Sequence, residues 1–177
     1  LERRDSRLSR LLRRRHPDAR EIRQAHAIHQ ATLRTVTTTL ARLGLAYDAV
    51  YRAQLRTTAR YDLVISVGGA GTLLQASHLV ADLPILGVNS DPRRSEAVFC
   101  AATRATFPIL LRQALAGRLP VRRLPRLQAA LNGRPLWPLV LNDVLIAHPD
   151  PATMSRYRLA VGAHRARPGK GQRRAGE

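Results

Sequence analysis

The sequence has little cysteine, few aromatic residues and no long apolar run. Cys100 is the only cysteine among 177 residues, which excludes an internal disulfide and leaves too few thiolates for a zinc or iron–sulfur cluster. We therefore expect a reducing compartment. No apolar run approaches the ~20 residues that span a bilayer, and no apolar export signal follows Leu1, so the sequence predicts neither membrane insertion nor export.

Acidic residues are also scarce, since 12 of them face 30 basic residues, for a net charge of +18. Such a charge favours binding to nucleic acid. However, Lys170 is the only lysine, and this excess of arginine is typical of a GC-rich coding sequence as well as of phosphate binding. Aromatic residues make up only 4%, without the spacing of an RNA- or DNA-reading module. We expect non-specific nucleic-acid binding, and a basic nucleic-acid binder stays an alternative function.

The length and the hydrophobic fraction of 45% fit one globular domain. Apolar positions at helical spacing predict a helix over 18–43, closed by Gly44 at its C-terminal end. Two runs that are apolar on both faces, 63–67 and 85–88, are typical of strands in a parallel sheet. The alternating order predicts a doubly wound α/β fold. The other predicted elements are a strand over 45–51 and helices over 72–80 and 106–116.

Beyond residue 119 the pattern becomes less regular. The sequence predicts a hairpin-like return from Leu127–Leu131 through Asn132-Gly133 to a strand over Leu139–Ala147, and one more strand at Tyr157–Val161. Residues 163–177 have the composition of a disordered tail. We divide the chain into a basic helical segment (1–24), an α/β nucleotide-binding domain (25–147), the start of a β-rich region (148–162) and a disordered basic tail (163–177).

The sharpest local motif is Val67-Gly68-Gly69-Ala70-Gly71-Thr72-Leu73-Leu74. Glycines between a buried strand and a helix let backbone N–H groups approach an anion, and the Thr72 hydroxyl adds a donor. The motif lacks the lysine of the Walker sequence and the third-glycine spacing of the dinucleotide fingerprint. It predicts a phosphate-binding loop, with a purely structural strand-to-helix turn as the alternative.

Three segments together resemble the NAD kinases. Residues 62–74 are similar to the segment that reads Gly-Gly-Asp-Gly-Thr in that family, and residues 86–96 are similar to a loop of the mitochondrial NAD kinase 2 type and its bacterial relatives. Residues 141–146 resemble the family's Asn-Glu/Asp motif. The resemblance extends over about 25–161, and lipid and sphingoid kinases share the glycine motif more distantly.

The resemblance implies phosphoryl transfer from ATP, with Mg²⁺, to the 2′-hydroxyl of the NAD adenosine ribose, giving NADP. It implies that nucleotides contact Gly68, Gly69, Gly71, Thr72, Asn142 and Asp143. The family's catalytic Asp position is Ala70, so no catalytic residue is retained, and no metal ligand is predicted. Loss of a general base costs about 10²–10⁴ in rate, so we expect weak or lost activity.

The resemblance also implies that the chain is truncated. It begins at Leu1 without the family's first strand, and family members continue into a β-rich domain that completes the NAD site and builds oligomers. We expect a frameshift near Gly162, and a homo-oligomer where that interface survives. A non-catalytic nucleotide- or partner-binding remnant is the alternative. A bacterial cytoplasm is the expected compartment, with a mitochondrial matrix as the second choice.

Three other features have ordinary structural roles as alternatives. His26 and His29 are expected to be solvated helix residues, because no carboxylate at the appropriate spacing makes them a metal site. Cys100 is expected to be a small buried hydrophobe. The arginines of the segment 91–94 could hold a phosphate, with a solvated turn as the alternative.

Overall fold

The computed structural model describes residues 17–55, 60–80, 82–150, 152–162, 164–165 and 169–170. The chain forms two compact units, Leu1–Asn142 and Asp143–Glu177, and each is described by itself. The elements of the first unit are α2 (Pro17–Arg42), the short 3₁₀ helix η1 (Arg52–Gln54), β1 (Val64–Gly68), α3 (Ala70–Ser77), β2 (Ile85–Asn89), β3 (Ala102–Thr103), α4 (Phe107–Leu115), β4 (Ala130–Leu131) and β5 (Arg134–Pro135).

The centre of the first unit is a parallel sheet with the strand order β1-β2-β3. In this register Gly68 pairs with Asn89, and Asn89 pairs with Thr103. The carboxyl ends of all three strands therefore meet at one edge, where ligands bind in open α/β sheets. The parallel sheet confirms the predicted fold class.

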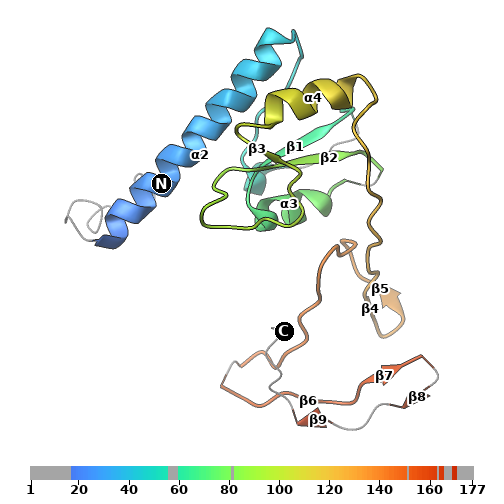
Figure 1. The fold of residues 1–177 in the computed structure, drawn as a ribbon. Helices are drawn as coiled ribbons and strands as arrows, with labels where there is room; N and C mark the ends of the chain where they lie inside the picture. The colour runs from blue at the N-terminus through green and yellow to red at the C-terminus, as the bar shows by residue number, and fades with distance from the viewer. Residues whose placement is uncertain are drawn as a thin grey trace. The chain divides into compact units, whose positions relative to one another are not determined.

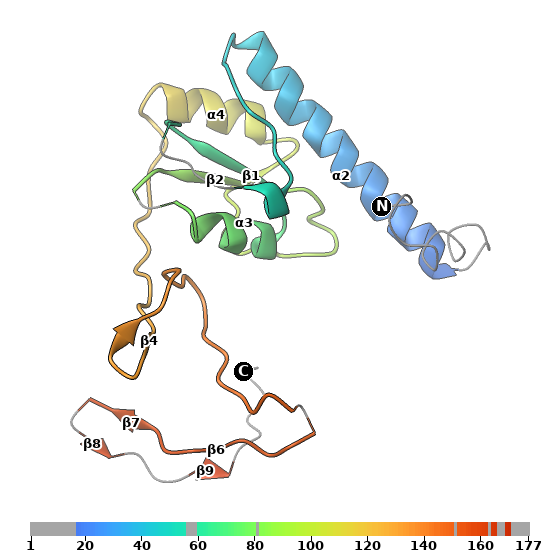
Figure 2. The same cartoon turned by 180° about the vertical axis from the view of Figure 1, so that it is seen from behind.

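Helices cover both faces of this sheet: α2 and α4 lie on one face and α3 lies on the other (Figures 1 and 2). Leu86 and Val88 of β2 join the core on the side of α2 and α4, where Phe107 and Leu111 are fully buried. Gly87 lies between them in sequence and faces α3, because a Cβ there would come within 2.6 Å of Leu73 Cδ1. The helices on both faces make the fold doubly wound, as predicted.

Helix ends follow the sequence pattern closely. The helix predicted over 18–43 is α2, and Gly44 after it has a φ of +66°. Gly117 after α4 has a φ of +64°. Both glycines adopt the left-handed conformation that costs a residue with a Cβ about 1 kcal/mol or more. The helix predicted over 72–80 is α3, which begins two residues earlier.

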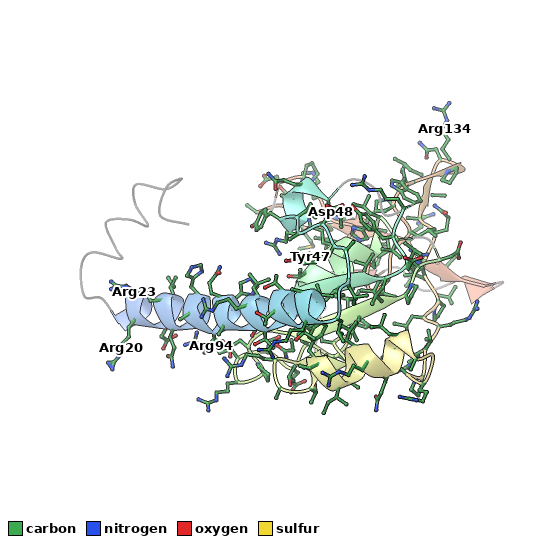
Figure 3. The ribbon with its side chains drawn as sticks, turned by 90° about the horizontal axis from the view of Figure 1, so that it is seen from above. Arg20, Arg23, Tyr47, Asp48, Arg94 and Arg134 are labelled. Atoms are coloured by element: carbon green, nitrogen blue, oxygen red, sulfur yellow. The ribbon has the colours of Figure 1, made fainter. Side chains whose placement is uncertain are left out.

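Two predicted strands, over residues 45–51 and 139–147, are wrong. Residues 45–51 are extended but pair with no described strand, and Tyr47 and Tyr51 are exposed. Asp48 instead accepts hydrogen bonds from Tyr61 Oη at 2.6 Å and Arg60 Nη2 at 3.0 Å; Tyr47 and Asp48 are labelled in Figure 3. Residues 139–147 form no strand beyond a single bridge from Val140 to Leu127. A hydrophobic segment forms a strand only where the backbone of a neighbouring strand is in place to form hydrogen bonds with it.

The predicted turn at Asn132-Gly133 is confirmed, because it joins the antiparallel strands β4 and β5. In the second unit the predicted strand at 157–161 is replaced by two short strands, β6 (Arg156–Tyr157) and β7 (Ala160–Val161). They pair with β9 (Gly169–Lys170) and β8 (His164–Arg165), respectively. Each of these strands has only two residues and so makes few backbone hydrogen bonds with its partner, fewer than a continuous strand over 157–161 would make.

The outer segments fall partly outside the described residues. Of the predicted basic segment 1–24, residues 17–24 are the first turns of α2, and residues 1–16 lie outside the description. In the predicted tail, the described residues 164–165 and 169–170 form β8 and β9, and its other residues lie outside. None of the described helices is long and apolar enough to cross a membrane.

Candidate functional site: a glycine loop at the carboxyl edge of the sheet

The glycine motif forms a tight passage from strand to helix at the carboxyl edge. Strand β1 ends at Gly68, Gly69 is the extended N-cap residue, and α3 begins at Ala70. The first turn closes when Thr72 N donates to Gly69 O at 3.1 Å. Since the first N–H groups of a helix have no carbonyl one turn earlier to pair with, those of Ala70 and Gly71 face outward. They form the positive end of α3, which favours an anion.

The three glycines have different local reasons to lack a side chain. A Cβ on Gly68 would overlap the Thr72 side chain, whose Cβ would be 2.8 Å away, so Gly68 is required by packing. A Cβ on Gly69 would make only an ordinary contact, at 3.4 Å from Ser95 Oγ. Gly71 is exposed, and a Cβ there would meet nothing within 4 Å. Packing in this chain therefore explains Gly68 and leaves Gly71 unexplained.

A second loop, Asn89–Glu96, packs beside the glycine loop. Asn89 is 5% exposed, and its side-chain Nδ2 donates to Ser95 O at 2.7 Å while its Oδ1 accepts from Asp91 N at 3.1 Å. Ser90 N donates to Gly68 O at 3.1 Å. Asn89 thus closes its own loop, and the bond from Ser90 holds that loop against the end of β1. The sequence reasoning assigned Asn89 no separate role, although a polar residue at the end of a buried strand is the signal that could have identified it.

The glycine loop contains no general base. Ala70 is half-buried at the first position of α3 and offers only a methyl group. The neighbouring loop carries two carboxylates: Glu96 is exposed, and Asp91 has an Oδ2 that is shielded from solvent and lies 3.8 Å from Arg94 Nη1. That ion pair holds the Asp91 carboxylate within its own loop. Among the described residues of this edge, the geometry therefore supports anion binding and supplies no proton acceptor at position 70.

Asn142 and Asp143 do not sit in the predicted structural setting. Both are exposed, and the strand that would have buried them does not form. Asn142 ends the first unit and Asp143 begins the second. The described geometry brings together Gly68, Gly69, Gly71 and Thr72, while a nucleotide contact by the other two residues stays a prediction.

The titratable side chains nearby do not suggest metal or thiol chemistry. Burial raises the pKa of the half-buried Cys100 thiol, which keeps it protonated and unreactive. Burial, and then the charge of His26, lowers the pKa of His29. Within the described part of the chain, no three His, Cys, Asp or Glu side chains are grouped to hold a metal ion.

Comparison with known proteins identifies the class to which this fold and loop belong. The profile of the ATP-NAD kinase N-terminal domain matches residues 7–118, more than half of the chain. The chain belongs to the NAD kinase family, which confirms the resemblance seen in its motifs. The matched region contains both the glycine loop and the loop that follows β2.

Individual relatives agree with this assignment. The chain is 39% identical over 147 residues to a protein named probable NADH kinase from Oryza sativa subsp. japonica, covering 73% of this chain and 45% of the relative. It is 34% identical over 126 residues to the NADH kinase of Arabidopsis thaliana, covering 62% and 40%. It is 30% identical over 149 residues to NAD kinase 2, mitochondrial, of Homo sapiens, covering 81% and 33%. The chain spans less than half the length of each of these relatives.

Proposed function

We propose that this chain is a nucleotide-binding NAD kinase domain, whose glycine loop binds the phosphates of ATP or NAD. The reaction of the whole family would be transfer of a phosphoryl group from ATP to the 2′-hydroxyl of the NAD adenosine ribose. Mg²⁺, where it takes part, would be bound chiefly through nucleotide phosphates, because no three His, Cys, Asp or Glu side chains of the described residues are grouped to hold it. The activity of this chain is proposed to be weak or lost.

The observation that carries the proposal is Gly71. Gly71 is the second residue of α3, its φ is not left-handed, and a Cβ there would meet no atom of the described residues within 4 Å, so neither packing nor backbone conformation calls for a glycine. A phosphate bound at the first turn of α3 needs the backbone N–H groups to be unobstructed, and a methyl group at Gly71 would project from that turn. Family membership supports the same interpretation.

Ala70 supports the second half of the proposal. The resemblance to the family predicts an Asp at this position, which would orient or deprotonate the attacking hydroxyl. The methyl group of an alanine can do neither. With the base absent and the loop intact, the chain would retain nucleotide binding and lose most of the chemical step.

The test compares the chain with its Ala70→Asp and Ala70→Asn variants. NADP formation from NAD and Mg-ATP is measured at matched protein concentration after circular dichroism has shown equal folding. An acidic residue in the first turn of a helix is favourable, so Ala70→Asp should fold. Activity gained by Asp and not by its uncharged isostere Asn would support the proposal. Robust activity of the unchanged chain would contradict the predicted loss.

A non-catalytic binding protein is the second candidate, and Ala70 favours it directly. Its test is thermal denaturation with increasing NAD or ATP, since a ligand that binds only the folded state raises the melting temperature with concentration. A chain without a formed nucleotide site would show no such rise. Steep salt dependence of DNA binding without any response to NAD would instead favour the basic nucleic-acid binder.

Assembly and compartment stay proposals. A homo-oligomer is expected from family resemblance, and sedimentation of the purified chain would test it. The arginine-rich composition favours a bacterial cytoplasm, whereas the human relative is named as a mitochondrial protein. Nucleotide binding as proposed here requires neither assignment.

A further inference from the structure

A concave surface lies between α2 and α4, the two helices that cover the same face of the sheet (Figures 1 and 2). It is an open groove of about 370 Å³. The C-terminal half of α2, Leu43 directly after it, and the first turns of α4 line this groove. The glycine loop leads into α3 on the opposite face, so the groove is separate from the candidate nucleotide site.

Arginines line the groove from both of its sides. Arg34, Thr38 and Arg42 occupy every fourth position of α2, so they form one row along that helix, about 12 Å long. Arg112 lines the groove from α4. All three arginines are exposed, and none has an ion-pair partner among the described residues. Their guanidinium groups are therefore not engaged by carboxylates of the described chain.

The two helices carry little negative charge near this groove. The last acidic residue of α2 is Glu21, more than three turns before Arg34, and α4 has none. The carbonyl groups at the end of α2 accept hydrogen bonds from the residues that follow, as when Leu45 N donates to Leu40 O at 3.1 Å. Pro108 of the first turn of α4 lines the groove, so the positive end of that helix dipole lies beside it. The groove is therefore a positively charged surface.

The other properties of the groove distinguish between classes of anionic ligand. Protein partners are usually anchored by aromatic or large apolar side chains, whereas the apolar residues here are Ala31, Leu43 and Pro108, and no described lining residue is aromatic. Small-molecule sites enclose most of their ligand, whereas this groove is open and its arginines are exposed. Exposed arginines and threonine hydroxyls are typical contacts to the phosphates of nucleic acid, and Thr38 supplies an exposed hydroxyl within the row.

We propose that the groove between α2 and α4 binds the phosphate backbone of double-stranded nucleic acid. About 12 Å of B-DNA carries about seven phosphates, so Arg34 and Arg42 contact separate phosphates while Arg112 contacts another from α4. The net charge of +18 attracts the polyanion from a distance, and the groove is where close contacts form. Without aromatic side chains the groove does not stack on bases, so binding is independent of sequence. This binding goes beyond the proposed nucleotide site and does not depend on it.

The test measures binding of a fluorescent DNA duplex by anisotropy over a series of salt concentrations. Arg34→Gln/Arg42→Gln/Arg112→Gln should weaken binding about tenfold or more and lower the slope of log affinity against log salt by about 2–3, because each lost phosphate contact removes about 0.9. The matched control is Arg122→Gln/Arg123→Gln/Arg134→Gln, which removes the same charge from exposed arginines of the first unit outside the groove. It should change the slope by less than about 1. Equal changes in both variants would show diffuse attraction and overturn the proposal, as would absence of DNA binding by the unchanged chain.

Three further measurements separate the phosphate contacts from other causes. Arg34→Lys/Arg42→Lys/Arg112→Lys should keep a slope close to that of the unchanged chain, because lysine also pairs with phosphate, and a slope as low as that of the glutamine variant would contradict the proposed contacts. Poly-glutamate at equal charge should displace the duplex poorly, and equal displacement would show a preference for acidic polypeptide instead. The glutamine variant should keep the thermal response to NAD. Loss of that response would show that the arginines act on the nucleotide site, which overturns a separate groove.

Discussion

Replacing Gly71 by alanine separates the structural and the functional reasons for the glycine loop. The added methyl group meets no protein atom within 4 Å, and the residue has no left-handed φ. A helical Gly→Ala substitution of this kind stabilises by about 0.4–1 kcal/mol, mainly by lowering the entropy of the unfolded chain. For a chain of this size the melting temperature should rise by about 1–4 °C.

The same substitution should weaken nucleotide binding. At a ligand concentration of 100 times Kd, a bound nucleotide stabilises the unchanged chain by about 2.7 kcal/mol, or about 5–10 °C. If the methyl group weakens binding tenfold, the gain at that concentration falls to about 1.4 kcal/mol. The variant would then be more stable than the parent without ATP and gain less from it.

Differential scanning fluorimetry with and without Mg-ATP measures both effects in one titration. Gln75→Ala is the matched control, because Gln75 is exposed on the same helix and is not part of the glycine motif. It should leave the response to ATP unchanged. An undiminished response in Gly71→Ala would refute the idea that a phosphate sits over this turn, and a lower melting temperature without ligand would refute the packing argument.

Three further predictions concern packing and pH. Gly87→Ala should destabilise by about 1–3 kcal/mol in urea denaturation, because its methyl group would lie 2.9 Å from the backbone Cα of Cys100; an unchanged midpoint would contradict this overpacking. Phe107→Ala should cost about 3–5 kcal/mol, whereas Ile109→Ala on the exposed side of α4 should cost far less, and equal costs would contradict the assigned core. Because burial lowers the pKa of His29 below 6.5 in the folded state, stability should be full above that pH and fall as the pH drops through it, since the unfolded chain takes up the proton first. His29→Gln should flatten this part of the stability profile, and an identical slope in the variant would show that other groups cause it.

The helices and strands around the glycine loop can be predicted from local sequence patterns, because each of these elements carries the apolar residues that it buries. The run before Gly68 is apolar enough to be a central strand, and the glycines after it are typical of a turn into a helix. Gly44 and Gly117 mark helix ends by a conformation that sequence alone suggests. These features depend on neighbours within a few residues, so they can be read without knowing the fold.

Features that depend on distant partners could not be predicted in the same way. Strand β3 has two residues and no hydrophobic periodicity. It forms because its backbone pairs with the edge of β2. Residues 45–51 and 139–147 have strand-like composition, but no described strand pairs with them beyond the Leu127–Val140 bridge. The Thr32 hydroxyl lies within hydrogen-bond distance of Ser90 O, 58 residues away, as well as of Ile28 O on its own helix, and no spacing rule indicates the longer-range contact. Such long-range contacts are therefore visible only in the structure.

Gly68 and Gly71 bear differently on what the chain does. Gly68 is required for the strand-to-helix turn whether or not a ligand binds, since any side chain there would overlap Thr72. It therefore does not distinguish a functional loop from a purely structural one. At Gly71 a methyl group would meet no atom of the described residues within 4 Å, so packing does not explain this glycine, whereas the proposed phosphate binding would. Ala70, between them, removes the proton acceptor and leaves the backbone donors intact. Together the three residues favour a loop that holds phosphate and does not itself promote transfer.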